Sequence, residues 1–494
     1  MAFNSLHFLI FFPIVILVYY IMPKKLRTFW LLAASYYFYM AWNPKYIVLI
    51  LISTLATYLS GLLLEKYESI KARKGIVAGC FVINLGLLFF FKYFDFLLSN
   101  INFLLEKMHI SVVANPFDVL LPVGISFYTF QALSYTVDVY RKEIKAEKNF
   151  LRYALFVSFF PQLVAGPIER SKNLLSQIEN LDDKKLFDYD KVVSGFSMMV
   201  YGMFLKVVLA DHISIFVDNV WKNTHAIGST VAILASVAFS LQIYCDFGAY
   251  SIIAIGAARM LGISLKENFN TPYFATSISD FWRRWHVSLS TWFRDYLYIP
   301  LGGSRCSKVK KYRNIMITFL VSGLWHGANW TYVIWGAIHG MYQVVGDLLK
   351  PLKEKLCKIT NVNKEVGSFR LLKIICTFAL TTFAWIFFRA DSFKAAFVFI
   401  KNMITRPDPW VLSTKEYLDF GVDASDLNLI IIGIIALVIV DLIRYKKNLD
   451  IGAFLIKQNL WFRWAVLIVL IVSTVVYGAY GTNFDSAQFI YFQF

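Results

Sequence analysis

Long apolar stretches separated by short charged segments recur along almost the whole chain, from Leu6 to Tyr480. A helix of about 20 apolar residues is long enough to cross the hydrocarbon core of a bilayer. A soluble protein of this length has no need for so many such runs. The pattern therefore predicts an all-α polytopic membrane protein with about 12 transmembrane helices.

The predicted spans follow the hydropathy and the charged residues that separate the apolar runs. They are 6–22, 28–42, 45–64, 76–97, 119–140, 192–210, 231–258, 371–388, 428–443 and 460–480, with two more in the double-length run 314–349. Glycines at 323, 327 and 336 are expected to break that run into its two passes.

One apolar segment does not fit a simple span. Residues 150–168 contain Pro161, Gly166 and Pro167, which interrupt helices. Unpaired backbone cannot face lipid, so this segment is predicted to be a re-entrant or broken helix buried within protein.

Composition strengthens the membrane interpretation. The chain is 58% apolar and only 16% charged, whereas soluble domains carry about 25% charged residues. Its net charge of +17 comes from Lys and Arg clustered in short loops, without a basic stripe that alternates with exposed aromatic residues. We therefore expect membrane lipids as neighbours and no nucleic acid.

The clustering of positive charge also predicts an orientation, because cytoplasmic loops are enriched in Lys and Arg. With both termini outside, most of the 49 Lys and Arg residues fall in the segments predicted to be cytoplasmic. These segments are 24–27, 65–75, 141–149, 169–191, 259–313, 350–373 and 443–463. The N-terminus has no basic residue before its first apolar run, so that run is read as a retained span and not as a signal peptide.

The chain is predicted to form a single membrane domain over residues 1–494. It divides into N-terminal helices (1–150), a central core (151–349) that includes the polar-aromatic cytoplasmic or interfacial segment 259–313, and C-terminal helices (350–494). The five cysteines are scattered without C-x-x-C spacing, which predicts neither a disulfide framework nor a metal site.

His326 is the first candidate for chemistry. It lies within an apolar run and is followed directly by Gly327. An ionisable side chain at such a place is costly, and imidazole suits a general base because it titrates near neutral pH. The alternative is a neutral histidine that is hydrogen-bonded between helices. His339, on the same run, is interpreted as a packing residue of that kind.

His286 is the second candidate. Ser277 followed by Asp280 resembles a capping box, and Trp282, His286 and Leu289 share one face of the helix that this start predicts. The helix is expected to lie at or below the cytoplasmic interface. A plain interfacial anchor, with His286 beside lipid headgroups, is the alternative.

A basic turn follows this predicted helix. Gly302, Gly303 and Arg305 precede a run of Lys and Arg, and such a turn can receive the phosphates of coenzyme A. The positive-inside rule explains the same charges without a ligand. Sequence motifs for nucleotide hydrolysis, zinc proteases and serine hydrolases are absent from the chain.

At these residues the chain resembles the membrane-bound O-acyltransferases, and within them the bacterial branch that acetylates polysaccharides such as alginate. The matching segments occur in order along nearly the whole chain. They are 1–6, 23–27, 121–131, 160–168, 280–305, 324–327 and 489–494. The resemblance implies a ring of tilted helices around a central funnel in a bacterial cytoplasmic (inner) membrane.

The resemblance also implies roles for individual residues. His326 corresponds to the near-invariant histidine of the family, and His286 corresponds to its second, polar signature position. A cytoplasmic thioester, most often acetyl-CoA, would donate the acyl group, and no cofactor would be bound permanently. The residues expected to position the donor or stabilise the oxyanion are Trp282, Trp285, Trp325, Asn329 and Arg305.

In this branch the acetyl group commonly passes to a separate extracytoplasmic transferase of the SGNH or esterase-like kind, which acetylates the polysaccharide. Two alternatives remain open at the level of sequence. One is D-alanyl transfer from a carrier protein to teichoic acid, as in another branch of the family. The other is a polysaccharide or lipid exporter without acyl chemistry. The polymer itself is not identified by the sequence.

Overall fold

The computed structural model describes residues 1–117, 120–181 and 187–480. These residues form helices and connecting loops without a strand, which confirms the predicted all-α class. The closing segment 489–494, which contributed to the family resemblance, lies outside the described residues.

Contacts along the chain divide it into two compact units. Among the described residues, the first unit comprises 1–199 and 250–266, and the second comprises 200–249 and 267–480. The helices α9 (Tyr189–Met203) and α11 (Ser229–Met260) contribute residues to both units. The subdivision of a single domain into 1–150, 151–349 and 350–494 stays a prediction.

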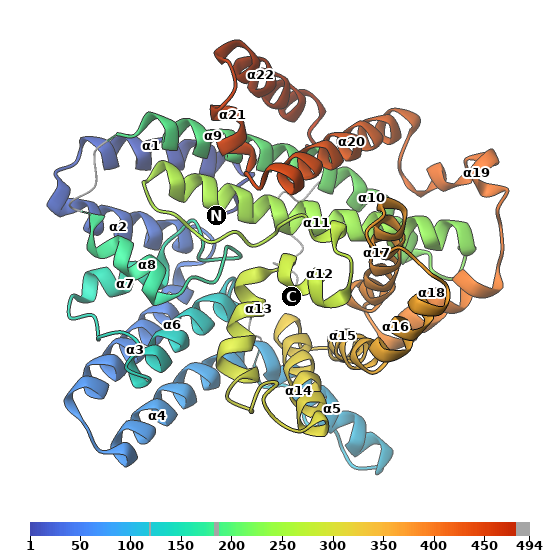
Figure 1. The fold of residues 1–494 in the computed structure, drawn as a ribbon. Helices are drawn as coiled ribbons and strands as arrows, with labels where there is room; N and C mark the ends of the chain where they lie inside the picture. Colours follow the sequence, from blue (N-terminus) through green and yellow to red (C-terminus); the bar gives the residue numbers. More distant parts are fainter. Residues whose placement is uncertain (118–119, 182–186, 481–494) are drawn as a thin grey trace. The chain divides into compact units, whose positions relative to one another are not determined.

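The first unit is built mainly from the N-terminal helices (Figure 1). They are α1 (Leu6–Ile21), η1 (Lys24–Leu26), α2 (Arg27–Met40), η2 (Pro44–Tyr46), α3 (Ile47–Lys66), α4 (Ile70–Leu88), η3 (Phe89–Tyr93), α5 (Phe94–Lys107), α6 (Ile125–Tyr140), α7 (Phe150–Ser158) and α8 (Ser171–Glu179).

The second unit contains the remaining helices. They are η5 (Phe204–Ala210), α10 (Asp211–Lys222), η6 (Pro272–Phe274), α12 (Ile278–Arg284), α13 (Val287–Phe293), η7 (Arg294–Tyr298), α14 (Lys308–His326), α15 (Trp330–Leu348), α16 (Lys350–Ile359), α17 (Gly367–Arg389), α18 (Phe393–Thr405), α19 (Val411–Thr414), η8 (Glu416–Phe420), α20 (Ala424–Lys447), α21 (Ile451–Ile456) and α22 (Leu460–Tyr477).

Among the described residues, 7 helical stretches are long and apolar enough to cross a membrane. They are Pro44–Lys66, Ile70–Lys107, Tyr189–Lys222, Ser229–Met260, Gly367–Arg389, Ala424–Lys447 and Leu460–Tyr477. Each overlaps a span predicted from hydropathy. Many of their apolar side chains are exposed, as on a surface that faces lipid.

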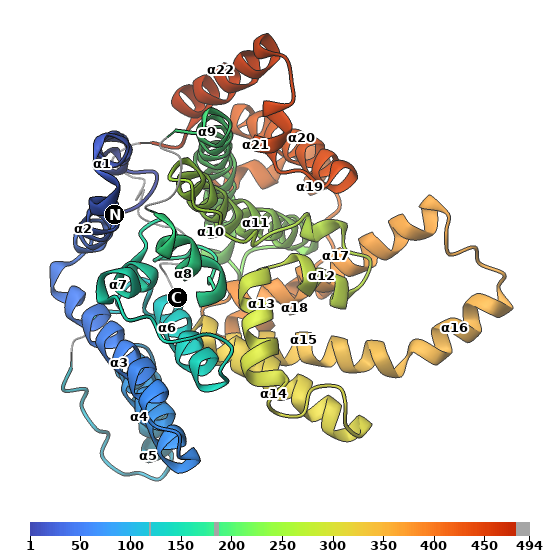
Figure 2. The ribbon, with the colours of Figure 1, turned by 60° about the vertical axis from the view of Figure 1, so that its left-hand side comes forward.

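Polar contacts between helices hold the first unit together. Figures 1 and 2 show α3 and α4 side by side, and Ser53 on α3 donates a hydrogen bond to Asn84 on α4. Tyr153 on α7 donates to Thr57 on α3 at 2.7 Å. Hydrogen bonds of this kind support helix association where no hydrophobic driving force is available.

Segment 150–168 is a broken helix, as predicted. Helix α7 ends at Ser158, and a series of turns follows around Pro161. Gln131 of α6 donates a hydrogen bond to the carbonyl oxygen of Phe156 near the end of α7. Residues 153–168 of this segment are buried inside the first unit, where their backbone can find partners.

Run 314–349 does form two helices, but the break is at Gly327–Asn329 alone. Gly323 and Gly336 lie inside α14 and α15, so the expectation that they break the run is wrong. A methyl group added at Gly323 would lie 2.2 Å from the carbonyl oxygen of Tyr332. One added at Gly336 would lie 2.2 Å from that of Phe319. These glycines therefore let the two helix backbones approach closely.

Candidate active site

The end of α14 presents His326. This residue is the last of the helix and is 3% exposed. Its ring lies 5.0 Å from that of Trp335 on α15 and 5.4 Å from that of Phe388 on α17, centroid to centroid, in edge-on contacts. Aromatic rings from both neighbouring helices thus hold the imidazole in the interior of the second unit.

His286 lies at a break between two helices. The single helix predicted through this region is wrong, because α12 ends at Arg284 and α13 begins at Val287. His286 occupies the intervening N-cap position with φ of 44°, in the left-handed region. It is fully buried, so it is not the headgroup neighbour of the anchor alternative.

The surroundings of His286 are aromatic and closed to solvent. Its ring contacts that of Phe247 on α11 at a centroid distance of 4.7 Å. Burial lowers the pKa of the His286 imidazole to about 3, because the charged form loses its hydration. The ring is therefore neutral at physiological pH and carries one nitrogen able to accept a proton.

The structure brings the two candidate histidines together. The centroids of the His286 and His326 rings lie 6.2 Å apart. The Trp325 ring lies 6.0 Å from the first and 5.0 Å from the second. Two residues 40 positions apart in the sequence thus share one small region, which a sequence pattern alone does not predict.

His339 belongs to the same cluster. The indole N–H of Trp282 donates a hydrogen bond to His339 Nδ1 at 3.3 Å, so the proton of the neutral ring is assigned to Nε2. The His339 ring lies 5.0 Å from that of Trp335, which also contacts His326. The packing role expected of His339 agrees with these contacts, and its closeness to the candidate site was missed.

Of the remaining candidate residues, Trp285 belongs to the aromatic cluster, whereas Asn329 and Arg305 have other surroundings. Trp285 is buried in the same aromatic cluster, with its ring 5.0 Å from that of Trp385. Asn329 caps α15 by accepting a hydrogen bond from the Thr331 amide, and it donates to the carbonyl oxygen of Asp391. Arg305 is exposed in the turn that follows η7.

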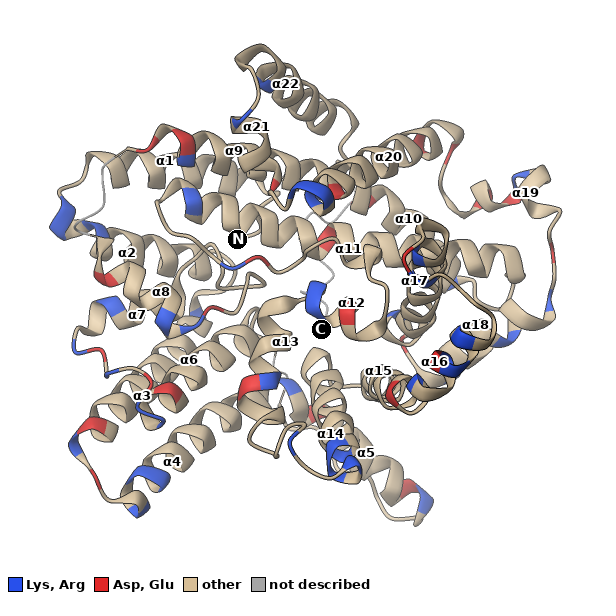
Figure 3. Ribbon diagram, viewed as in Figure 1, with Lys and Arg blue, Asp and Glu red and all other residues tan. Residues whose placement is uncertain are grey.

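Several Lys and Arg residues follow that turn in the sequence. Figure 3 shows them at the start of α14, where Lys308, Lys310, Lys311 and Arg313 are found. Lys311 pairs with Asp347 on α15 at 2.9 Å. This basic end and the aromatic histidine cluster are carried by opposite ends of α14.

A buried charged cluster lies elsewhere in the second unit. Lys206 Nζ lies 2.8 Å from Asp211 Oδ1 and 2.5 Å from Asp246 Oδ1, and all three side chains are nearly inaccessible to solvent. Opposite charges at these distances offset much of one another's desolvation. These three ionisable groups are therefore paired with one another.

Imidazoles in a buried aromatic setting can perform proton transfer. One can accept a proton from a hydroxyl as it attacks a carbonyl, and another can orient a reactant or donate a hydrogen bond. The described residues place the His286 and His326 rings 6.2 Å apart, with the Trp325 ring beside both. The arrangement suits acyl transfer to a hydroxyl.

Comparison with known proteins points in the same direction. Residues 95–389 match the model of MBOAT, the membrane-bound O-acyltransferase family. The matched stretch is more than half of the chain and contains His286, His326 and His339.

Individual relatives are similar over a still larger part of the chain. A probable alginate O-acetylase of Pseudomonas syringae is 38% identical over 402 residues, which are 80% of this chain and 74% of that protein. A peptidoglycan O-acetyltransferase of Helicobacter pylori is 35% identical over 424 residues, 80% and 78% of the two chains. A teichoic acid D-alanyltransferase of Bacillus subtilis is 27% identical over 292 residues, 56% and 71% of the two chains.

Proposed function

This chain belongs to the membrane-bound O-acyltransferase family and is an O-acyltransferase, and on that premise we propose that it moves an acetyl group towards a cell-surface or exported polysaccharide. The donor is a cytoplasmic thioester, acetyl-CoA. The acetyl group crosses to the outer face, where an extracytoplasmic transferase of the SGNH or esterase-like kind completes the transfer.

The observation that carries the proposal is the placement of His326 beside His286. Their rings lie 6.2 Å apart within a buried aromatic cluster, where a proton can be moved without competition from bulk water. His326 removes the proton of the acceptor hydroxyl as its oxygen attacks the thioester carbonyl. The carbon–sulfur bond then breaks, and the departing thiolate takes up a proton to leave as free CoA.

Other residues of the site take supporting roles in this proposal. His286 and Trp282 position the donor, with Trp285 and Trp325 closing the aromatic surroundings. Asn329 stabilises the developing oxyanion, and Arg305 in the basic turn receives the donor's phosphates. No permanent cofactor or metal takes part.

The membrane topology of the proposal is 12 spans around a central funnel, in a bacterial cytoplasmic membrane with both termini outside. The distribution of Lys and Arg supports it. The basic start of α14 then faces the cytoplasm, where acetyl-CoA is found. Seven of these spans are the helical stretches among the described residues that are long and apolar enough to cross a membrane. Helices α1, α2, α6, α14 and α15 supply the others.

Acetyl transfer is favoured over D-alanyl transfer by the comparisons. The relatives named as an alginate O-acetylase and a peptidoglycan O-acetyltransferase share 38% and 35% identity, each over 80% of this chain. The D-alanyltransferase shares 27% over 56%. The exporter alternative loses its basis, because the family is one of acyltransferases and the buried Lys206 is ion-paired with Asp211 and Asp246.

The test uses the purified full chain in liposomes with acetyl-CoA labelled in its acetyl group. With a polysaccharide supplied as the hydroxyl acceptor, we expect the wild type to release free CoA and to transfer the label to that acceptor. His326→Ala is expected to lose about 10²-fold or more of this activity. His225→Ala serves as the matched control, because His225 is an exposed histidine of the same unit. Equal transfer by wild type and His326→Ala would refute the base assignment. Transfer from a D-alanyl carrier protein, with none from acetyl-CoA, would favour the other branch.

A further inference from the structure

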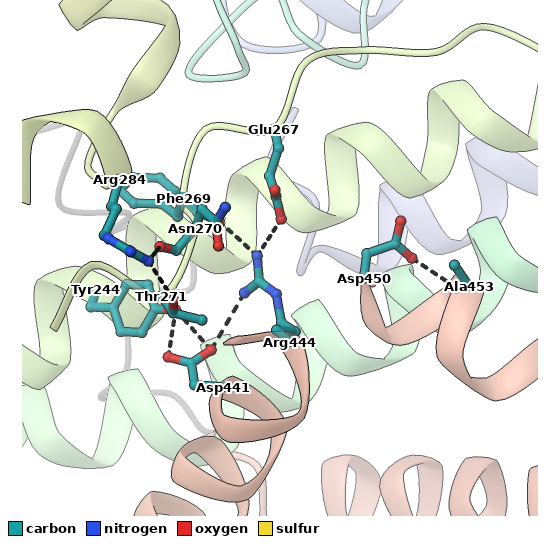
Figure 4. Close-up of polar contacts among 10 residues, drawn as sticks. All are labelled: Tyr244, Glu267, Phe269, Asn270, Thr271, Arg284, Asp441, Arg444, Asp450 and Ala453. Carbon is teal, nitrogen blue, oxygen red and sulfur yellow. Dashed lines mark hydrogen bonds and ion pairs between the residues drawn. The ribbon is translucent and has the colours of Figure 1, made fainter. Parts of the chain in front are cut away.

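Helix α20 carries a buried arginine that binds the segment next to His286. Arg444 is 8% exposed, and Figure 4 shows its guanidinium group between Glu267, Phe269 and Asp441. It donates to the carbonyl oxygen of Phe269 at 2.7 Å and to Asp441 Oδ1 at 3.4 Å, and it pairs with the carboxylate of Glu267. Asp441 also accepts a hydrogen bond from the Tyr244 hydroxyl at 2.8 Å.

The segment that Arg444 holds is itself bonded to both sides of His286. The Asn270 amide donates to the carbonyl oxygen of Arg284 at 2.9 Å, and the Val287 amide donates to that of Asn268 at 3.0 Å. Asn268 Oδ1 accepts from the amide of Ser288 at 3.2 Å and from its hydroxyl at 2.8 Å. Residues 268–270 therefore act as a backbone template for residues 284–288.

His286 needs such a template. Its φ of 44° places a residue with a Cβ in the left-handed region, which residues other than glycine adopt uncommonly. A conformation of this kind persists only when the surrounding contacts determine it fully. The Phe269 ring lies nearly parallel to the His286 ring, with their centroids 6.4 Å apart. The residue whose carbonyl oxygen Arg444 binds is therefore also a neighbour of the imidazole.

We propose that Arg444 is a positioning residue for His286, and that Asp441 and Glu267 orient its guanidinium group for this role. The planar fork of an arginine can bind a carbonyl oxygen and two carboxylates at once, which a lysine ammonium does not reproduce. Arg444 lies outside residues 95–389, the stretch that matches the family model. The C-terminal region of this chain thus completes a site whose histidines lie within the family match.

The first test reads the conformation at His286 without any enzyme assay. The full chain in detergent is treated with diethyl pyrocarbonate, and the modification of each histidine is followed by mass spectrometry. In Arg444→Lys we expect His286 to be modified about tenfold faster or more, the size expected when one charge-assisted hydrogen bond is lost. His339, which is held by Trp282 and not by residues 268–270, is expected to keep its wild-type rate.

Arg463→Lys is the matched control. Arg463 also donates to backbone carbonyl oxygens, those of Ile456 and Gln458, and its change is expected to leave His286 protected. Asp441→Asn provides a second variant if Arg444→Lys fails to fold, with the same selective effect on His286. An unchanged rate at His286, or equal acceleration at His286, His326 and His339, overturns the proposal. The second of these results would mean general loosening of the unit.

The second test rests on the proposed function. With labelled acetyl-CoA, Arg444→Lys is expected to lower kcat about tenfold while KM stays within about twofold. The arginine acts through His286, which aligns the bound donor for attack, and not through Arg305, which receives the donor's phosphates. In a His286→Asn background the same change is expected to add no further loss, because the residue through which it acts is gone. Independent, multiplicative losses would overturn the positioning role. An inactive wild type would instead refute acetyl transfer, and the diethyl pyrocarbonate result would still test the positioning role.

Discussion

The α14–α15 hairpin and the α12–α13 break both present histidines to one cluster, but they are held in different ways. His326 and His339 lie on regular helices whose close approach depends on Gly323 and Gly336, within the hairpin itself. His286 lies in a left-handed conformation between two short helices of seven residues each. Its backbone is fixed by Asn268, which lies in a segment that Arg444 binds.

One part of the site is therefore positioned by contacts between helices that are neighbours in sequence, and the other by contacts with residues far away in sequence. A hairpin with small residues at its contact positions can form from one continuous stretch of chain, since its helices are neighbours in sequence. A strained turn between two short helices has no such local support and depends on contacts with distant residues. Substitutions in the α14–α15 hairpin should therefore act by changing the distance between the two helix backbones. Substitutions at the α12–α13 break should act by changing the backbone conformation at His286.

The largest expected effect is that of Gly336→Val in the hairpin. A Cβ at this position would lie 2.2 Å from the Phe319 carbonyl oxygen and 3.2 Å from the Gly323 Cα, so the two helices must move apart. We expect the free energy of unfolding to fall by about 3 kcal/mol or more. Thermal unfolding of the purified protein in detergent measures the change.

Gly346→Ala is its control on the same helix. No atom lies within 4 Å of the Cβ that this change adds, so stability is expected to stay the same or to rise slightly. A wild-type unfolding temperature for Gly336→Val would show that the helix approach is not as close as described.

A smaller effect is expected from comparing two replacements of His286. Valine is disfavoured in the left-handed region whereas asparagine tolerates it. His286→Val should therefore be less stable than His286→Asn by about 1–2 kcal/mol. Chemical unfolding curves of the two variants give this difference.

The same two replacements at His339 test whether the preference is specific to the break. His339 lies within the regular helix α15, where valine and asparagine have similar propensities. No comparable preference for asparagine is expected there. If asparagine is equally favoured at both positions, the strain assigned to His286 is not real.

The smallest effect concerns the start of α15. Asn329 Oδ1 accepts a hydrogen bond from the Thr331 amide, so Asn329→Ala is expected to lower stability by about 1 kcal/mol. Asn329→Ser keeps a capping oxygen and should recover most of that loss. Thermal unfolding of both variants checks the cap, and an Ala variant as stable as the Ser variant contradicts it.

The sequence predicted the parts of the site that depend on residue type and local order. An imidazole in an apolar run made His326 a candidate, a predicted amphipathic helix made His286 the second, and the family resemblance gave both of them roles. The continuous helix predicted through His286 was wrong, because the hydrophobic spacing of residues 282–293 suits a helix on both sides of the break. No local signal near Arg444 or Asn268 indicated that they hold this segment.

By itself the sequence determined that the chain is helical, apolar enough for a membrane and a member of an acyltransferase family. These properties follow from hydrophobic periodicity and from motifs of neighbouring residues. Only the tertiary structure decided that His286, His326 and His339 share one aromatic cluster and that Arg444 contacts the backbone beside it. Packing between residues far apart in the chain produces those contacts, and a linear pattern carries little information about which distant residues will meet.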